Sequence, residues 1–216
     1  MKERLKRVRT PGAGGTPPAR AVRSVLVLLL GVGLGLLAKW LDELAPDGEI
    51  WWHRILERLD LGNVFSGLAV WLVLALAIAV FSATPLRAAL HVFLFFAGMC
   101  VSYHVYTVVF SGFDPGGYMR IWYGLTLLSP VFAVFCWYGK GPSPVSVAID
   151  CLILAVLAAA CFSLGFWYFG LNGGVNALLF PAGAAIVYSN PRQSVVSVAV
   201  GLLLAFPLRA VLPFGF

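Results

Sequence analysis

Two ionisable side chains lie inside apolar stretches of this sequence. A polar group is costly in such surroundings and is therefore a candidate for a functional role. His91 and Asp150 each lie within the first two helical turns of such a stretch. A charged carboxylate in the hydrocarbon of a membrane costs several kcal/mol unless it has a partner. We therefore expect a buried polar pair of His91 and Asp150. One alternative is structural: Asp150 is neutral, or it is bonded to His91, Arg87 or Ser146 and so joins two helices. The other is functional: Asp150 is part of a site for an ion, a proton or a substrate.

A second group of polar and aromatic residues lies near the opposite ends of the same stretches. Arg120 and Arg209 could together bind an anionic group, because guanidinium groups match carboxylates and phosphates in shape and charge. The alternative is that both arginines reach the lipid headgroups and that the aromatic rings belong to the membrane interface. The candidate ligand-binding residues are His104, Tyr106, Arg120, Trp122, Trp167, Tyr168 and Arg209.

Motifs of known enzymatic chemistry are missing from the sequence. It contains no HExxH metal helix, no GxSxG nucleophile elbow, no P-loop and no CxxC pair. Cys100, Cys136, Cys151 and Cys161 all lie in apolar stretches and are expected to be small core residues. We therefore predict no catalytic residue, no metal site and no cofactor.

The composition favours a membrane protein, and the elements that position these residues are membrane-spanning helices. Hydrophobic residues make up 61% of the 216 and charged residues 11%, whereas a soluble domain has about 45–50% and 25%. About 20 apolar residues cross a bilayer as a helix. We expect an all-α bundle of about seven spans, of which the sixth, with Pro181 and Gly183, is either a kinked span or a re-entrant segment. The predicted spans are 23–40, 64–83, 87–110, 120–139, 144–164, 175–189 and 193–213.

The charge distribution predicts the domains and the orientation. Residues 1–22 are rich in Lys, Arg, Pro and Gly, and we predict a disordered basic tail in the cytoplasm followed by a membrane domain, 23–216. The Trp-Tyr pairs 122–123, 137–138 and 167–168 then fall at the outer, inner and outer membrane boundaries. The tail's charge is explained by topology, so no specific nucleic-acid partner is expected. The predicted location is the cell membrane, the inner or plasma membrane of a bacterium.

The longest predicted loop, 41–62, contains an amphipathic helix over residues 50–61. An apolar stripe runs from Trp51 to Leu59, and charged residues occupy the opposite face. We expect this helix to lie on the outer membrane surface, or to act as a lid over an outward-facing cavity.

Two segments resemble stretches of small uncharacterised multi-pass proteins of bacterial membranes. They are 111–140 (SGFDPGGYMRIWYGLTLLSPVFAVFCWYGK) and 166–169 (FWYF). This resemblance implies no activity or site. In size and aromatic richness the chain is also similar to the substrate-binding membrane subunits of energy-coupling-factor vitamin transporters. Its predicted seventh span is a difference from those subunits.

Three functions remain open from the sequence. The first is a helical bundle that binds a small molecule or a lipid headgroup from the outer face, alone or as a transport subunit. The second is an assembly or regulatory subunit that forms a homo-oligomer or contacts a partner membrane subunit through glycine-rich helix faces such as Gly31/Gly35. The third, an intramembrane enzyme, is least favoured because no nucleophile accompanies the buried polar pair. The lipid bilayer is a partner in every case.

Overall fold

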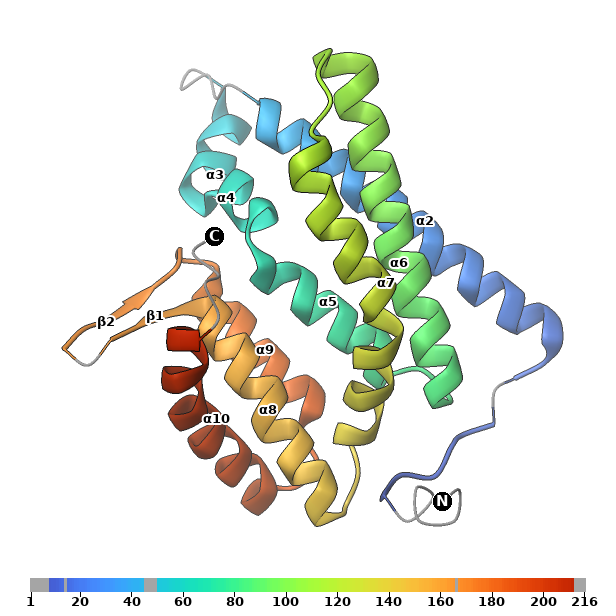
Figure 1. The fold of residues 1–216 in the computed structure, drawn as a ribbon, viewed down its shortest axis with the longest axis vertical. Coiled ribbons are helices and arrows are strands. Elements are labelled where there is room, and N and C mark those ends of the chain that lie inside the picture. Colours follow the sequence, from blue (N-terminus) through green and yellow to red (C-terminus); the bar gives the residue numbers. More distant parts are fainter. Residues whose placement is uncertain (1–7, 14, 45–49, 166, 212–216) are drawn as a thin grey trace.

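Long apolar helices dominate the structure, a computed structural model that describes residues 8–13, 15–44, 50–165 and 167–211 (Figure 1). In this part of the chain, five helices are long and apolar enough to cross a membrane. Helices of this length and composition are consistent with an integral membrane protein. They are α2 (Pro17–Glu43), α6 (Pro85–Tyr106), α7 (Gly116–Gly139), α8 (Pro144–Cys161) and α10 (Pro191–Val211).

Two further apolar helices are short. The helix α5 (Leu68–Val80) has 13 residues and α9 (Asn176–Val187) has 12. At 1.5 Å per residue they are about 20 and 18 Å long, whereas the hydrocarbon of a bilayer is about 30 Å thick. No residue of α5 is exposed, whereas α9 packs against it with one face and leaves residues such as Leu178 exposed. The two helices share a core cluster that includes Leu76, Val80 and Val187. The structure thus supports a helical bundle, while the predicted count of about seven full spans is not confirmed.

The helices that begin at one end of the bundle start with proline. Proline suits the first helical position because its missing N–H would have no partner there and its φ is already helical. Thr84 and Ser143 add caps, since their side-chain oxygens accept hydrogen bonds from the backbone N–H groups of Arg87 and Ser146. The prolines are Pro17, Pro85, Pro144 and Pro191.

Residues 8–13 lie against this same end, which we call the tail end. Arg9 donates hydrogen bonds to the carbonyls of Val80 (2.9 Å) and Trp137 (2.6 Å), and its guanidinium lies 4.4 Å from the Trp137 ring centroid. Burial lowers the pKa of Arg9. The contacts have a clear cause, because the last carbonyls of α5 and α7 lack helical partners and attract a cation. Of the tail that we predicted to be disordered, this part packs on the bundle, and residues 17–22 form the first turns of α2; residues 1–7 and 14 lie outside the described residues.

The opposite end, which we call the hairpin end, carries three small elements. The helix α3 (Trp51–Leu59) falls within the amphipathic helix predicted for 50–61, and α4 (Leu61–Ser66) follows it directly. A two-stranded antiparallel hairpin, β1 (Phe162–Leu164) and β2 (Phe169–Leu171), continues from α8. The hairpin projects from the bundle (Figure 1), and it replaces the last turn of the predicted span 144–164. At this end a π-helical segment, η1 (Thr107–Ser111), extends α6.

Glycines bring α2 close to α6 within the chain. A Cβ on Gly31 would meet the backbone of Phe95, and a Cβ on Gly35 would meet the backbone of Met99 and the hydroxyl of Ser102. The small-residue face therefore packs on a neighbouring helix of the same molecule. It is not free to contact a second protein, as the assembly hypothesis required of this face.

Candidate functional site

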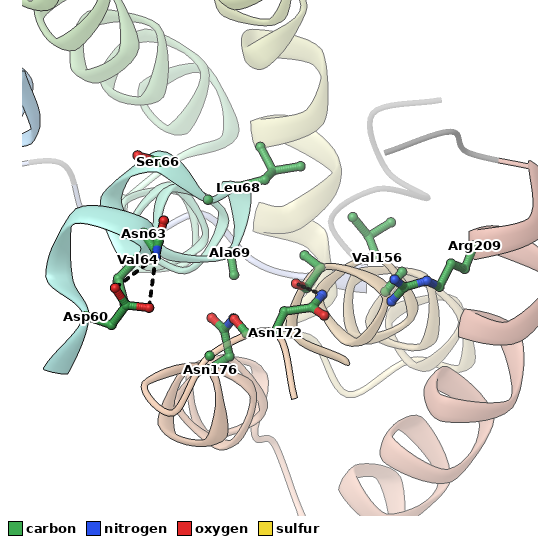
Figure 2. Close-up of a pocket in the computed structure, with 14 residues that line it drawn as sticks. Asp60, Asn63, Val64, Ser66, Leu68, Ala69, Val156, Asn172, Asn176 and Arg209 are labelled. Carbon is green, nitrogen blue, oxygen red and sulfur yellow. Dashed lines mark hydrogen bonds between the residues drawn. The ribbon is translucent and has the colours of Figure 1, made fainter. Parts of the chain in front are cut away.

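A cavity of about 420 Å³ lies at the hairpin end (Figure 2). Four parts of the chain enclose it: the junction of α4 and α5, the last turns of α8, the segment after β2, and the end of α10. Apolar side chains form part of the wall, with Leu68 from α5 and Val156 from α8. The polar side chains that line the cavity are Asp60, Asn63, Ser66, Asn172, Asn176 and Arg209.

Arg209 comes from the end of α10 and has two roles. Its guanidinium donates hydrogen bonds to the carbonyl of Phe162 and to the hydroxyl of Ser163. These bonds join α10 to the hairpin and satisfy a carbonyl that the end of α8 leaves free. The remaining N–H donors have no partner in the part of the chain that the structure describes, and the side chain points toward the cavity (Figure 2). Arg209 is therefore available to bind an anion.

Two asparagines of the cavity wall are held by the hairpin and by α9. The hydroxyl of Ser163 donates to Asn172 Oδ1, and Asn172 Nδ2 donates to the carbonyl of Ala160 at 3.1 Å. Asn176, at the start of α9, donates its Nδ2 to the carbonyl of Asn172. The amides are thus fixed in place, which is the arrangement that orients a polar ligand.

Asp60 and Asn63 form the opposite side of the cavity. Asp60 links α3 to α4 with a left-handed backbone, φ 51°, a conformation that aspartate adopts more readily than most residues. Asn63 Nδ2 donates to both carboxylate oxygens of Asp60, at 2.8 and 3.0 Å. Figure 2 shows Asp60 and Arg209 on opposite sides of the cavity, with Asn172 and Asn176 between them. One end of the site is therefore acidic and the other basic.

The start of α5 adds a partial positive charge. Leu68 and Ala69, the first residues of this helix, line the cavity. No side chain caps the helix at Gly67, so the first N–H groups of α5 have no side-chain partner and carry the positive end of the helix dipole. This helix end favours an anionic ligand as Arg209 does.

Of the seven predicted binding residues, Arg209 lines the cavity and the others lie elsewhere. His104 is hydrogen-bonded within the bundle, to the Tyr123 hydroxyl (2.9 Å) and to Asp114 (3.1 Å). Arg120 is exposed and donates to the carbonyl of Gly116. The contacts of His104 join α6 to α7 and to the loop before α7. The two predicted arginines therefore do not form one anion site with His104.

The predicted aromatic residues divide into buried and exposed rings. Trp122 is 8% exposed and packs edge-on against Trp71 in the core. Tyr106, the last residue of α6, contacts Phe110 of η1. Trp167, at the tip of the hairpin, is 98% exposed, and Tyr168 beside it is also exposed. The hairpin rings do not line the cavity, and their exposure agrees with the alternative that they are interface residues.

His91 and Asp150 are both buried near the tail end, but the side chains around them differ. His91 Nδ1 lies 3.1 Å from the Ser82 hydroxyl. Asp150 packs on Gly139, since a Cβ on that glycine would lie 2.6 Å from the Asp150 Oδ1 atom. His91 Nε2 and Asp150 Oδ1 have no hydrogen-bond partner among the described residues. The predicted pair is therefore not joined by a hydrogen bond between these atoms, and α7 contacts both helices.

A second charged cluster at the hairpin end has its partners within the chain. Lys39 is buried and forms ion pairs with Asp42 (3.1 Å) and Glu43 (3.3 Å) one turn along α2. The Tyr103 hydroxyl donates to Asp42 and the Ser111 hydroxyl to Glu43. These bonds fix the end of α2 to α6 and to η1, which explains the cluster without a ligand.

Five polar residues of the cavity were missed by sequence reasoning: Asp60, Asn63, Ser66, Asn172 and Asn176. Each lies beside a predicted span boundary, where a polar residue is expected in any membrane protein. The sequence did contain a signal, because three of the five are asparagines and all five lie near glycines. Sequence alone does not show that these boundaries meet in space.

No group of three or more His, Cys, Asp or Glu side chains that could hold a metal ion occurs among the described residues. Comparisons of the chain with protein-family models, with curated proteins and with solved structures found no match. The cavity and its side chains are therefore the basis for a functional proposal.

Proposed function

We propose that this membrane protein binds the anionic group of a small molecule or of a lipid headgroup in the cavity at its hairpin end. The observation that carries the proposal is Arg209, whose guanidinium faces a cavity of about 420 Å³ while two of its bonds hold it to the hairpin. An arginine fixed by the protein loses little freedom on binding a carboxylate or phosphate. The uncapped start of α5 adds a second source of positive potential in the same wall.

The hairpin end is proposed to face the outside of the cell. Arg9, which belongs to the basic N-terminal part of the sequence, is at the opposite end of the bundle, and basic residues mark the cytoplasmic side of membrane proteins. The exposed hairpin residues Trp167 and Tyr168 fit the headgroup level of the outer surface. A ligand would then enter from the outer aqueous phase or from the outer leaflet.

The test is a ligand screen on the purified full chain in dodecyl maltoside, with thermal unfolding as the measurement. Anionic metabolites and water-soluble headgroup analogues are screened, and at least one is expected to raise the unfolding midpoint in a saturable manner. Arg209→Gln is expected to weaken that binding at least tenfold, because a charge-assisted hydrogen bond is lost. Arg120→Gln, which alters an arginine outside the cavity at the same end, is the matched control.

A second variant tests the same cavity in case Arg209→Gln does not fold. Ala159 lines the cavity from α8, and Ala159→Leu would fill part of the space without removing any hydrogen bond. Loss of binding in both variants, with unchanged binding in Arg120→Gln, is the expected result. Binding that survives in both cavity variants would place the ligand elsewhere and contradict the proposal.

Transport is a second candidate, favoured by the two short helices. α5 begins at the cavity and packs against α9, which also begins there. Secondary transporters commonly build their sites at the ends of short or interrupted helices near a cavity. Proteoliposomes that contain the chain should then accumulate the bound compound, and Ala159→Leu should stop uptake. Saturable binding without any uptake would leave a receptor role and remove the transport role.

A further inference from the structure

We infer that the ligand of this cavity is a zwitterion whose ammonium group faces Asp60 and whose anionic group faces Arg209. The inference rests on the proposed function and narrows it to one class of ligand. Its starting point is the separation of charge across the site, with a carboxylate on one side and a guanidinium on the other (Figure 2).

Neither charge is neutralised by a salt bridge within the described chain. The hydrogen bonds of the Asp60 carboxylate come from the neutral amide of Asn63, and those of the Arg209 guanidinium go to a carbonyl and a hydroxyl. By contrast, Lys39 at the same end is paired with two carboxylates. The cavity thus keeps two opposite charges that a ligand can satisfy.

A ligand with a single charge would be opposed by one side of the site. An anion near Arg209 would also face the carboxylate of Asp60, and a cation near Asp60 would face the guanidinium. A zwitterion in the matching orientation is attracted at both ends, which is the usual basis of electrostatic selectivity.

The rest of the wall offers polar and apolar contacts to the part of the ligand between the two charges. Asn172 and Asn176 lie between Asp60 and Arg209 (Figure 2), and amides can bond ester or hydroxyl oxygens. Leu68 and Val156 provide apolar contact for methylene groups. A molecule that carries both a primary ammonium group and a phosphate or carboxylate meets these conditions. It could come from a lipid headgroup or from a free molecule.

The experiment compares three soluble probes with the full chain in dodecyl maltoside: glycerophosphoethanolamine, glycerophosphoglycerol and ethanolamine. The first two share a phosphodiester, and of these two only glycerophosphoethanolamine has an ammonium group. We expect glycerophosphoethanolamine to bind about three- to fivefold more tightly than glycerophosphoglycerol, the gain of one partly exposed ion pair. Ethanolamine alone should bind most weakly. Calorimetric titration measures each Kd.

The decisive variant is Asp60→Asn, which keeps the size of the side chain and removes its charge. It should bring the ratio of the two phosphodiester affinities close to one, without weakening glycerophosphoglycerol. Asp114→Asn alters an exposed aspartate at the same end but outside the cavity, and it should leave the ratio unchanged. Because the readout is a ratio within one variant, a general loss of affinity does not imitate the expected result.

Two other results overturn the inference and are distinguishable. The native chain could bind the two phosphodiesters equally, with both affinities lost in Arg209→Gln. This result would exclude a preference for a zwitterion and leave the proposed function intact. Failure of all three probes to bind would contradict the inference, and failure of the whole anion screen would contradict the proposed function as well.

A final experiment distinguishes a lipid headgroup from a free molecule as the source of the zwitterion. The chain is placed in nanodiscs of phosphatidylglycerol alone or of equal parts phosphatidylglycerol and phosphatidylethanolamine. If the lipid headgroup occupies the site, phosphatidylethanolamine will compete and raise the apparent Kd for glycerophosphoethanolamine severalfold. An unchanged Kd in the second nanodisc assigns the site to a free zwitterion. Both results support a zwitterionic ligand in this cavity.

Discussion

At the scale of single residues, the surroundings of a side chain decide its role more than its type does. Arg120 and Arg209 are both arginines at the hairpin end, yet the first is exposed and bonds to its own helix, while the second faces a cavity. The same contrast applies to the glycines of α2. Gly31 touches α6, whereas a Cβ on Gly33 would meet nothing within 4 Å.

The glycines of α2 give a prediction with a built-in control. Gly31→Ala should reduce the free energy of unfolding by about 1–3 kcal/mol, because the added methyl group collides with the backbone of Phe95. Gly33→Ala should be neutral or stabilising by up to about 1 kcal/mol, since alanine favours helix over glycine. Thermal midpoints in dodecyl maltoside measure both. An unchanged midpoint in Gly31→Ala together with a changed oligomeric state would instead favour the assembly hypothesis.

The candidate site could be predicted only in part from these residues. Arg209 was identified because a charge near the end of an apolar stretch is conspicuous. Arg209, Asp60 and Asn172 line the same cavity although they lie far apart in sequence. Charge patterns along one helix do not contain that information, which is why Arg209 was grouped with His104 and Arg120.

At the scale of elements, the long helices could be predicted and the interruptions could not. The spans predicted at 23–40 and 120–139 fall within α2 and α7, because hydropathy over about 20 residues is a strong signal. The break at Gly67 was missed because the flanking residues are equally apolar. The Trp71 indole donates to the Phe65 carbonyl at 2.9 Å and so satisfies a group that the break leaves free.

The hairpin was missed for a related reason. Phe162 and Leu164 are apolar and read as the last turn of a span, but the chain leaves α8 at Cys161 and turns extended. Arg209, 47 residues away, takes up the carbonyl of Phe162. A contact over that distance in sequence compensates the lost helical bond, and no local pattern predicts it.

The segment 8–13 gives a prediction at this scale. Arg9→Ala should lower the free energy of unfolding by about 1–3 kcal/mol, because two carbonyls lose a charged donor and Trp137 loses a cation–π contact. Thr10→Ala, at an exposed neighbouring position, should change little. The midpoint of tryptophan fluorescence on heating compares the two. Equal midpoints for both variants would show that the tail does not stabilise the bundle.

At the scale of the whole molecule, the two ends have different chemistry. The tail end gathers the proline starts of the long helices and the bound segment 8–13. The hairpin end gathers the cavity, the exposed rings and the short helices α3 and α4. This asymmetry underlies the proposal that the hairpin end faces outward and receives the ligand.

Cysteine labelling in right-side-out membrane vesicles tests this central claim most directly. Asn63→Cys lies at the cavity and Thr10→Cys lies in the tail segment, and both positions are exposed. The native chain, whose cysteines lie within apolar helices, gives the background. A membrane-impermeant maleimide should label Asn63→Cys in intact vesicles and Thr10→Cys only after permeabilisation. Labelling of Thr10→Cys in intact vesicles, with Asn63→Cys protected until permeabilisation, would contradict the proposed orientation and the outward-facing site.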